Sequence, residues 1–136
     1  MNYIAILEKE PETLVGGWFP DCPGAIAAGE TLDEATASAV EALRLWATEA
    51  LHRGETLPSA RPLDEIVADP EIAAMLAKGA IAVAIPLIVD RGRQTRVNIS
   101  LDVGALEAID EAARRKGMTR SAFMTDAAIG EVASLV

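Results

Sequence analysis

The first thirty residues alternate between apolar and polar positions in three short segments. The alternating runs span 2–10, 14–24 and 25–30, and turn-forming residues follow each of them. Alternation with a period of two is typical of strands that bury one face. Pro20 breaks the second run and Gly29 stops the third, so the pattern predicts three successive β-strands.

A long helix is predicted directly after these strands. Thr31 and Glu34 have the spacing of a capping box, and Gly54 stands where a helix stop belongs. Apolar residues recur between them at helical spacing, at Ala35, Ala39, Leu43, Trp46 and Ala50. The pattern therefore indicates an amphipathic helix with one apolar face.

A short helix and a fourth strand are predicted next. Asp69 has the position of a cap, Pro70 that of the first helical residue, and Gly79 lies just past the end. The run 80–90 is apolar on both faces, so we expect the helix to cover one face and another subunit to cover the other. Pro86 places the second half of this strand at an edge or strand end.

The last part of the chain begins with a linker and a further alternating segment. Residues 91–95 are a linker by composition, and Thr95–Leu101 alternates strictly. Asp102 and Thr119 are placed to cap two helices. The solvent side of the first helix carries two i, i+4 ion pairs, Asp110–Arg114 and Glu111–Arg115.

The strand predicted at 95–101 has no partner in its own domain. A lone strand leaves its hydrogen-bonding edge open, and about 40 residues cannot form an independent core. Both problems disappear if two copies pair these strands antiparallel across a two-fold axis and share a helical core. The residues expected in this dimerisation core are Val97, Ile99, Leu101, Leu106, Ile109, Phe123 and Ile129.

The polar residues of the same segment are candidates for DNA binding. The candidate DNA-binding residues are Arg96, Asn98, Ser100, Thr119, Arg120 and Ser121. The first three would point outward on a two-stranded ribbon, and such a ribbon fits the major groove of DNA. There an Arg side chain can bond guanine, an Asn side chain can bond adenine, and a Ser side chain can bond either base. The last three start the second helix, where free amides and the helix dipole suit a phosphate. The alternative is that the strand residues are only a solvated face.

The two predicted domains, 1–90 and 91–136, differ in charge. The first holds five Lys/Arg and fifteen Asp/Glu, a net charge of −10, whereas the second holds seven and six, a net charge of +1. An acidic surface repels nucleic acid and attracts basic proteins. The charge therefore indicates a basic protein partner for the first domain and is compatible with DNA for the second.

The segment 18–43 carries a set of motif residues. A strand ending in F-P-D-x-P-G is followed by a short strand and by G-[ED]-[ST]-x-[DE]-E-A, and the matching residues are Phe19, Pro20, Asp21, Pro23, Gly24, Gly29, Glu30, Thr31, Asp33, Glu34 and Ala35. The first half of the chain thus resembles the N-terminal domain of HicB-type antitoxins, and residues 95–134 resemble ribbon-helix-helix repressor domains. The resemblance implies a partial RNase H-like fold without nuclease chemistry that covers its toxin, a HicA-type mRNA interferase.

The residues give little support to catalysis. Cys22 and His52, the single cysteine and histidine, have nothing near them in sequence to orient them as a catalytic pair, and together they cannot make a zinc site within one chain. An active RNase H-like enzyme would need several clustered carboxylates, which the short strand 25–28 and the apolar run before Asp90 lack. We therefore expect no catalytic residue, no metal and no cofactor.

The chain is expected to be cytoplasmic and without a membrane partner. Its start lacks the features of a signal peptide, and its longest apolar run, 80–89, is far shorter than the roughly 20 residues of a membrane helix. One cysteine excludes an intrachain disulfide, which is compatible with a reducing compartment.

We interpret the sequence as an α+β protein with an N-terminal partial RNase H-like β-β-β-α-β domain and a C-terminal ribbon-helix-helix domain. The expected function is that of a type II antitoxin that neutralises a HicA-like toxin and represses its own operon by binding operator DNA. We expect a homodimer, with a tetramer as a further assembly. The alternative is a stand-alone ribbon-helix-helix regulator whose N-terminal domain senses a ligand or oligomerises.

Overall fold

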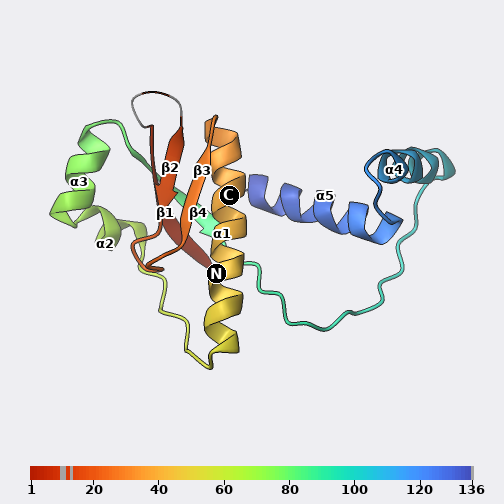
Figure 1. Ribbon diagram of the computed structural model, residues 1–136, viewed down its shortest axis with the longest axis horizontal. Helices are drawn as coiled ribbons and strands as arrows, with labels where there is room; N and C mark the ends of the chain where they lie inside the picture. Colours follow the sequence, from red (N-terminus) through yellow and green to blue (C-terminus); the bar gives the residue numbers. More distant parts are fainter. Residues whose placement is uncertain (10–11, 13, 136) are drawn as a thin grey trace. The chain divides into compact units, whose positions relative to one another are not determined.

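Four strands in the first part of the chain form one antiparallel sheet, and two helices make up the last part (Figure 1). The computed structural model describes residues 1–9, 12 and 14–135. The chain divides into two compact units, 1–91 and 92–135. The elements, in chain order, are β1 (Asn2–Lys9), β2 (Val15–Trp18), β3 (Ile26–Gly29), α1 (Leu32–His52), α2 (Leu63–Val67), α3 (Pro70–Ala77), β4 (Ile81–Pro86), α4 (Val103–Arg115) and α5 (Arg120–Ser134).

The sheet has the order β3-β2-β1-β4, and all its neighbouring strands are antiparallel. Ile6 of β1 is opposite Trp18 on one side and opposite Ala82 on the other. The three opening strands and the fourth strand are therefore confirmed. Residue 10, which the first predicted strand includes, lies outside the described residues. β4 ends at Pro86, and among the described strands it is paired with β1 alone, as the proline indicated.

Helix α1 lies against one face of the sheet. Its buried side is made by Ala35, Ala39, Val40, Leu43, Ala47 and Ala50. Small residues allow a close approach: a Cβ atom on Gly29 would lie only 2.4 Å from the backbone nitrogen of Ala35. Trp46, predicted on the apolar face, is only half-buried, and its indole N–H donates to the carbonyl of Pro23 at 2.9 Å.

The opposite face of the sheet is covered by α2 and α3. Ile66 of α2 and Ile72 of α3 are buried in one cluster with Ile6 of β1 and Ala80, and Trp18 packs against it. Ala82 of the fourth strand packs against this cluster, so part of the side that the sequence analysis assigned to another subunit is covered by the chain itself. The reason is that the connection after α1 folds back as two short helices, of which the sequence pattern indicated only the second.

The predicted starts of the helices are largely confirmed. The Thr31 hydroxyl accepts from the Glu34 N–H at 3.1 Å, but the Glu34 carboxylate accepts from the N–H of Glu30, one residue earlier than in the usual capping box. Asp69 caps α3 by accepting from the N–H of Glu71 at 2.9 Å.

The strand predicted at 95–101 is not formed in the single chain. Residues 93–102 are in neither a helix nor a strand, and residues 91–101 are all exposed. A strand is defined by hydrogen bonds to a neighbouring strand, and the described part of the second unit offers none. The helices predicted after it, α4 and α5, are confirmed.

Candidate functional site

The second unit carries the six candidate DNA-binding residues at two places. Arg96, Asn98 and Ser100 lie on the segment before α4, and the other three lie at the start of α5; all six are exposed. An open groove of about 780 Å³ brings four of them together, and these are Asn98, Ser100, Arg120 and Ser121. Arg96 and Thr119 are not among the residues that line it.

The residues expected in a dimerisation core leave much apolar surface uncovered. Val97 is 72% exposed and Ile99 is 62% exposed, and Leu101 is exposed as well. Leu106, Ile109, Phe123 and Ile129 are half-buried. Ala113 is the only residue of the described second unit that is buried. The single copy therefore presents an apolar row that the chain itself does not cover.

The start of α5 is held by a side-chain cap. The hydroxyl of Thr119 accepts from the N–H of Ala122 at 3.1 Å, so this oxygen is already used within the helix start. Asp102 caps α4 in the same way, accepting from the N–H of Gly104 at 2.9 Å. Both predicted caps are confirmed, and they fix the ends of the helices next to the candidate site.

Arg120 makes a two-pronged ion pair with Asp110. The Nε and Nη2 atoms of Arg120 donate to the two carboxylate oxygens of Asp110 at 2.7 and 2.8 Å. These hydrogen bonds hold the pKa of Asp110 below its ordinary value, because they stabilise the charged carboxylate. The guanidinium that the sequence assigned to a phosphate is therefore engaged within the unit, where it joins α4 to α5.

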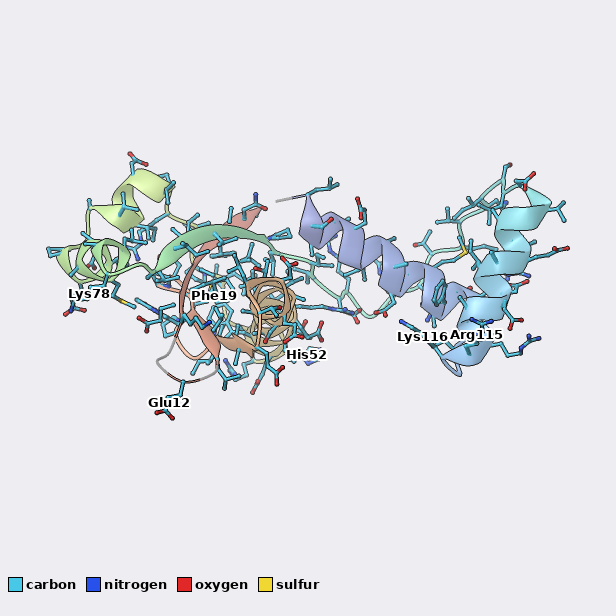
Figure 2. All side chains as sticks on the ribbon, turned by 90° about the horizontal axis from the view of Figure 1, so that it is seen from above. Glu12, Phe19, His52, Lys78, Arg115 and Lys116 are labelled. Atoms are coloured by element: carbon cyan, nitrogen blue, oxygen red, sulfur yellow. The ribbon has the colours of Figure 1, made fainter. Side chains whose placement is uncertain are left out.

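The pairing of Asp110 differs from the sequence expectation. The i, i+4 pair Glu111–Arg115 is present at 3.4 Å, but Arg114 binds Glu111 rather than Asp110. Sequence reasoning missed the contact of Asp110 with Arg120, because Arg120 lies ten residues away and across a turn. Spacing rules for one helix cannot reveal such a pair. Arg115 and Lys116 mark the end of α4 in Figure 2.

The motif residues at 19–24 form the predicted tight turn. The N–H of Cys22 donates to the carbonyl of Phe19 at 3.2 Å, and the N–H of Ala25 donates to the carbonyl of Cys22 at 3.1 Å. Gly24 has a φ of 92°, which a glycine adopts without strain. The turn therefore reverses the chain between β2 and β3.

Asp21 of this turn anchors the connection after α1. Its side chain is only 7% exposed. One carboxylate oxygen accepts from the Arg61 Nε at 2.6 Å, and the other accepts from the Arg61 backbone N–H at 2.9 Å. Nearby, the Tyr3 hydroxyl donates to the carbonyl of Pro58 at 2.5 Å. The geometry gives Asp21 a structural role, and no sequence signal pointed to Arg61 as its partner.

Cys22 and His52 have different environments. Cys22 is fully buried, and burial, together with the nearby charge of Asp21, raises the pKa of its thiol to about 12. His52 is exposed at the end of α1, whereas Phe19 is almost fully buried; both are labelled in Figure 2. A thiol with such a pKa is a poor nucleophile at neutral pH.

Neither a metal-binding cluster nor a membrane-spanning helix is found in the described residues. No group of three or more His, Cys, Asp or Glu side chains among residues 1–9, 12 and 14–135 is arranged to hold a metal ion. Within the same ranges, no helix combines the length and apolar character needed to cross a bilayer.

The chain thus combines an α+β unit, in which helices cover both faces of the sheet, with a helical unit that exposes an apolar row. The chain belongs to the HicB-like antitoxins of bacterial toxin–antitoxin systems, whose family model matches residues 3–128. Antitoxins of this family are generally non-enzymatic. The resemblance that the motif residues indicated is thus confirmed.

Solved structures and a phage protein resemble the chain. The HicB antitoxin of Burkholderia pseudomallei is 28% identical, with a TM-score of 0.56, and the match covers 94% of this chain and 96% of that one. The HicA3–HicB3 toxin–antitoxin complex contains a chain that is 26% identical, with a TM-score of 0.52 and coverage of 66% and 99%. An uncharacterised 14.9 kDa protein of Haemophilus phage HP1 is 29% identical over 98% of this chain and 99% of its own length.

Proposed function

We propose that this antitoxin neutralises a HicA-like mRNA interferase through its first unit and represses its own operon through a dimer of its second unit. The observation that carries the proposal is the family match over both units, residues 3–128. It is supported by the similarity to a chain from a toxin–antitoxin complex. The order β1-β2-β3-α1 in the first unit is compatible with a partial RNase H-like fold.

The toxin-binding part of the proposal rests on charge. Residues 1–90 have a net charge of −10. An RNase that grips phosphates is basic, so opposite charges steer the two proteins together. Neutralisation then occurs by covering the toxin's active site, which needs neither a cofactor nor chemistry from the antitoxin.

The DNA-binding part rests on the exposed row of apolar residues before α4. Pairing of residues 95–101 from two copies would bury Val97, Ile99 and Leu101 against the helices of both copies. Arg96, Asn98 and Ser100 would then face the major groove as a two-stranded ribbon. Two such dimers joined through their first units would gain effective concentration on paired operator sites.

The test is co-expression of the full chain with the small basic reading frame that neighbours its gene. We expect rescue of growth from the toxin, co-purification of the two proteins, and binding of the pair or the free antitoxin to DNA from the operon's promoter. A variant that ends at residue 91 should still rescue growth but should lose DNA binding. DNA binding without a toxic neighbour would instead support a stand-alone regulator and would overturn the toxin-binding part.

A further inference from the structure

The outward side of α1 forms a second open groove, in the first unit. The groove has a volume of about 410 Å³ and runs between α1 and the start of β3. Its apolar floor and walls are made by Ala25, Ile26, Ala42, Leu45 and Trp46. Ala42, Leu45 and Trp46 lie on α1 but are not among its buried residues, whereas Ile26 begins β3 and Ala25 precedes it. Ala25 is buried and Trp46 belongs to the predicted apolar face, but neither the sequence pattern nor the core assigns a role to Ile26, Ala42 or Leu45.

Two large apolar residues of this groove are open to solvent. Ile26 is 72% exposed and Leu45 is 61% exposed, although both are large aliphatic side chains. They project from different elements, a strand and a helix, and line one hollow. Contiguous exposed apolar surface of this kind marks an interaction site more often than a scattered single residue does.

Trp46 gives the groove a fixed aromatic wall. Its indole N–H donates to the carbonyl of Pro23 at 2.9 Å, which ties the ring of a helix residue to the motif turn. A ring held in this way loses little conformational entropy when a partner packs against it. Tryptophan is also enriched among the residues that contribute most to binding at protein interfaces. The groove is therefore preorganised for a protein partner.

The rim of the groove is acidic. Glu41 and Glu49 line it, and the described residues that line it include no Lys or Arg. Each glutamate has an intrahelical partner, since Glu41 lies 3.9 Å from Arg44 and Glu49 lies 2.9 Å from Arg53. Both carboxylates are nevertheless well exposed, so they can also attract a basic partner.

We propose that this groove between α1 and β3 is the docking surface for the basic RNA-cleaving toxin. The proposal rests on the toxin-binding function proposed above and names the surface that performs it. An aliphatic or aromatic side chain of the toxin fills the space between Leu45 and Trp46, and lysine or arginine side chains around it meet Glu41 and Glu49. Charge complementarity favours such a partner over a second copy of this acidic unit.

The test measures binding of the full-length chain to the toxin of the neighbouring reading frame, with the toxin's catalytic histidine replaced by alanine. Leu45→Arg introduces a positive charge into the groove and should weaken binding at least tenfold. Leu63→Arg makes the same change at the half-exposed Leu63 of α2 and is the matched control. Glu49→Gln should weaken binding severalfold and reduce its dependence on salt. Circular dichroism and the midpoint of urea unfolding check that each variant is folded.

Three outcomes are distinguishable. Loss of binding in Leu45→Arg with binding retained in Leu63→Arg supports the groove. Equal binding by wild type and Leu45→Arg overturns the groove but leaves the toxin-binding function standing. Absence of binding by the wild type overturns both. If Leu45→Arg fails to fold, Leu45→Ala and Ile26→Ala replace it. Unchanged affinity of both alanine variants for the toxin would also overturn the proposal that the groove is the docking surface.

Discussion

Arg120 at the start of α5 is bound by both carboxylate oxygens of Asp110 in α4, at 2.7 and 2.8 Å. The pair connects the two helices of the second unit across the turn between them. It also holds a cation at the N-terminal end of a helix, the place where the sequence predicts a phosphate contact. Any DNA phosphate that binds Arg120 must compete with Asp110 or share the guanidinium with it.

Removal of the Asp110 charge should strengthen DNA binding. Asp110→Asn frees the guanidinium of Arg120 and removes a negative charge near the phosphates, so we expect severalfold tighter binding to operator DNA at fixed salt. Glu107→Gln is the matched control, because it makes the same change in net charge on α4 and leaves the pairs of Arg120, Arg114 and Arg115 intact. Fluorescence anisotropy measures both. Equal effects of the two variants would show that only net charge matters.

Arg96→Ala should weaken operator binding by about 1–3 kcal/mol and alter the preference at one base pair. The reason is that a guanidinium on the proposed ribbon bonds a guanine edge. Arg93→Ala, three residues earlier and also exposed, serves as the control for loss of charge alone. Binding is measured at matched salt with a set of single-base operator variants. If Arg96→Ala behaves like Arg93→Ala at every base pair, the ribbon does not read the sequence.

Gly29→Ala should destabilise the first unit by about 1–3 kcal/mol, because the added methyl group meets the backbone of α1 rather than a side chain that can move. Its Cβ atom would lie 2.4 Å from the nitrogen of Ala35 and 2.7 Å from the carbonyl carbon of Glu34. Gly130→Ala in α5 meets nothing within 4 Å and should increase helix stability by up to about 1 kcal/mol. Urea unfolding followed by circular dichroism measures both changes. A neutral Gly29→Ala would contradict the close packing of β3 and α1.

The Cys22 thiol should resist alkylation in the folded protein. Its pKa of about 12 lies above the ordinary 9.0, so the native thiolate fraction at pH 8 is lower by roughly 1000-fold. The unfolded chain releases this proton first as the pH rises. The thiol therefore contributes stability below pH 9 that is lost progressively between pH 9 and about 12.

Two measurements check this prediction. Labelling with iodoacetamide at pH 8 should be slow for the native protein and fast in urea. The free energy of unfolding should fall more steeply above pH 9 for the wild type than for Cys22→Ala. The substitution removes the buried thiol and also the part of the raised pKa of Tyr3 that comes from Cys22, while the part that comes from burial of Tyr3 remains. Rapid labelling of the native protein would show that the thiol is accessible.

Local patterns predicted most of the first unit. Alternation revealed the strands, while Thr31, Asp69 and Gly54 marked helix ends, because these signals depend on neighbours in sequence. They could not reveal α2, whose five residues are too few to show a period. The sequence therefore did not predict the second helical layer over the sheet, in which Ile66 and Ile72 pack against Ile6.

Contacts between distant residues were beyond the sequence. The pairs Asp21–Arg61 and Asp110–Arg120 join different elements, and no periodicity encodes them. The strand at 95–101 was predicted from alternation, but the single chain does not form it, because its hydrogen bonds need a neighbour. The candidate site residues of the tail were identified by type and spacing, and their roles stay predictions.

The scarcity of buried side chains in the second unit has a consequence for how the protein responds to its own abundance. With Ala113 as the only buried residue among those described there, the unit gains little from folding alone. If association supplies the missing core, ordering of the unit becomes a second-order process. Halving the concentration of the antitoxin would then lower the concentration of DNA-binding dimers about fourfold in the dilute regime. Repression would therefore be relieved steeply as the antitoxin is degraded.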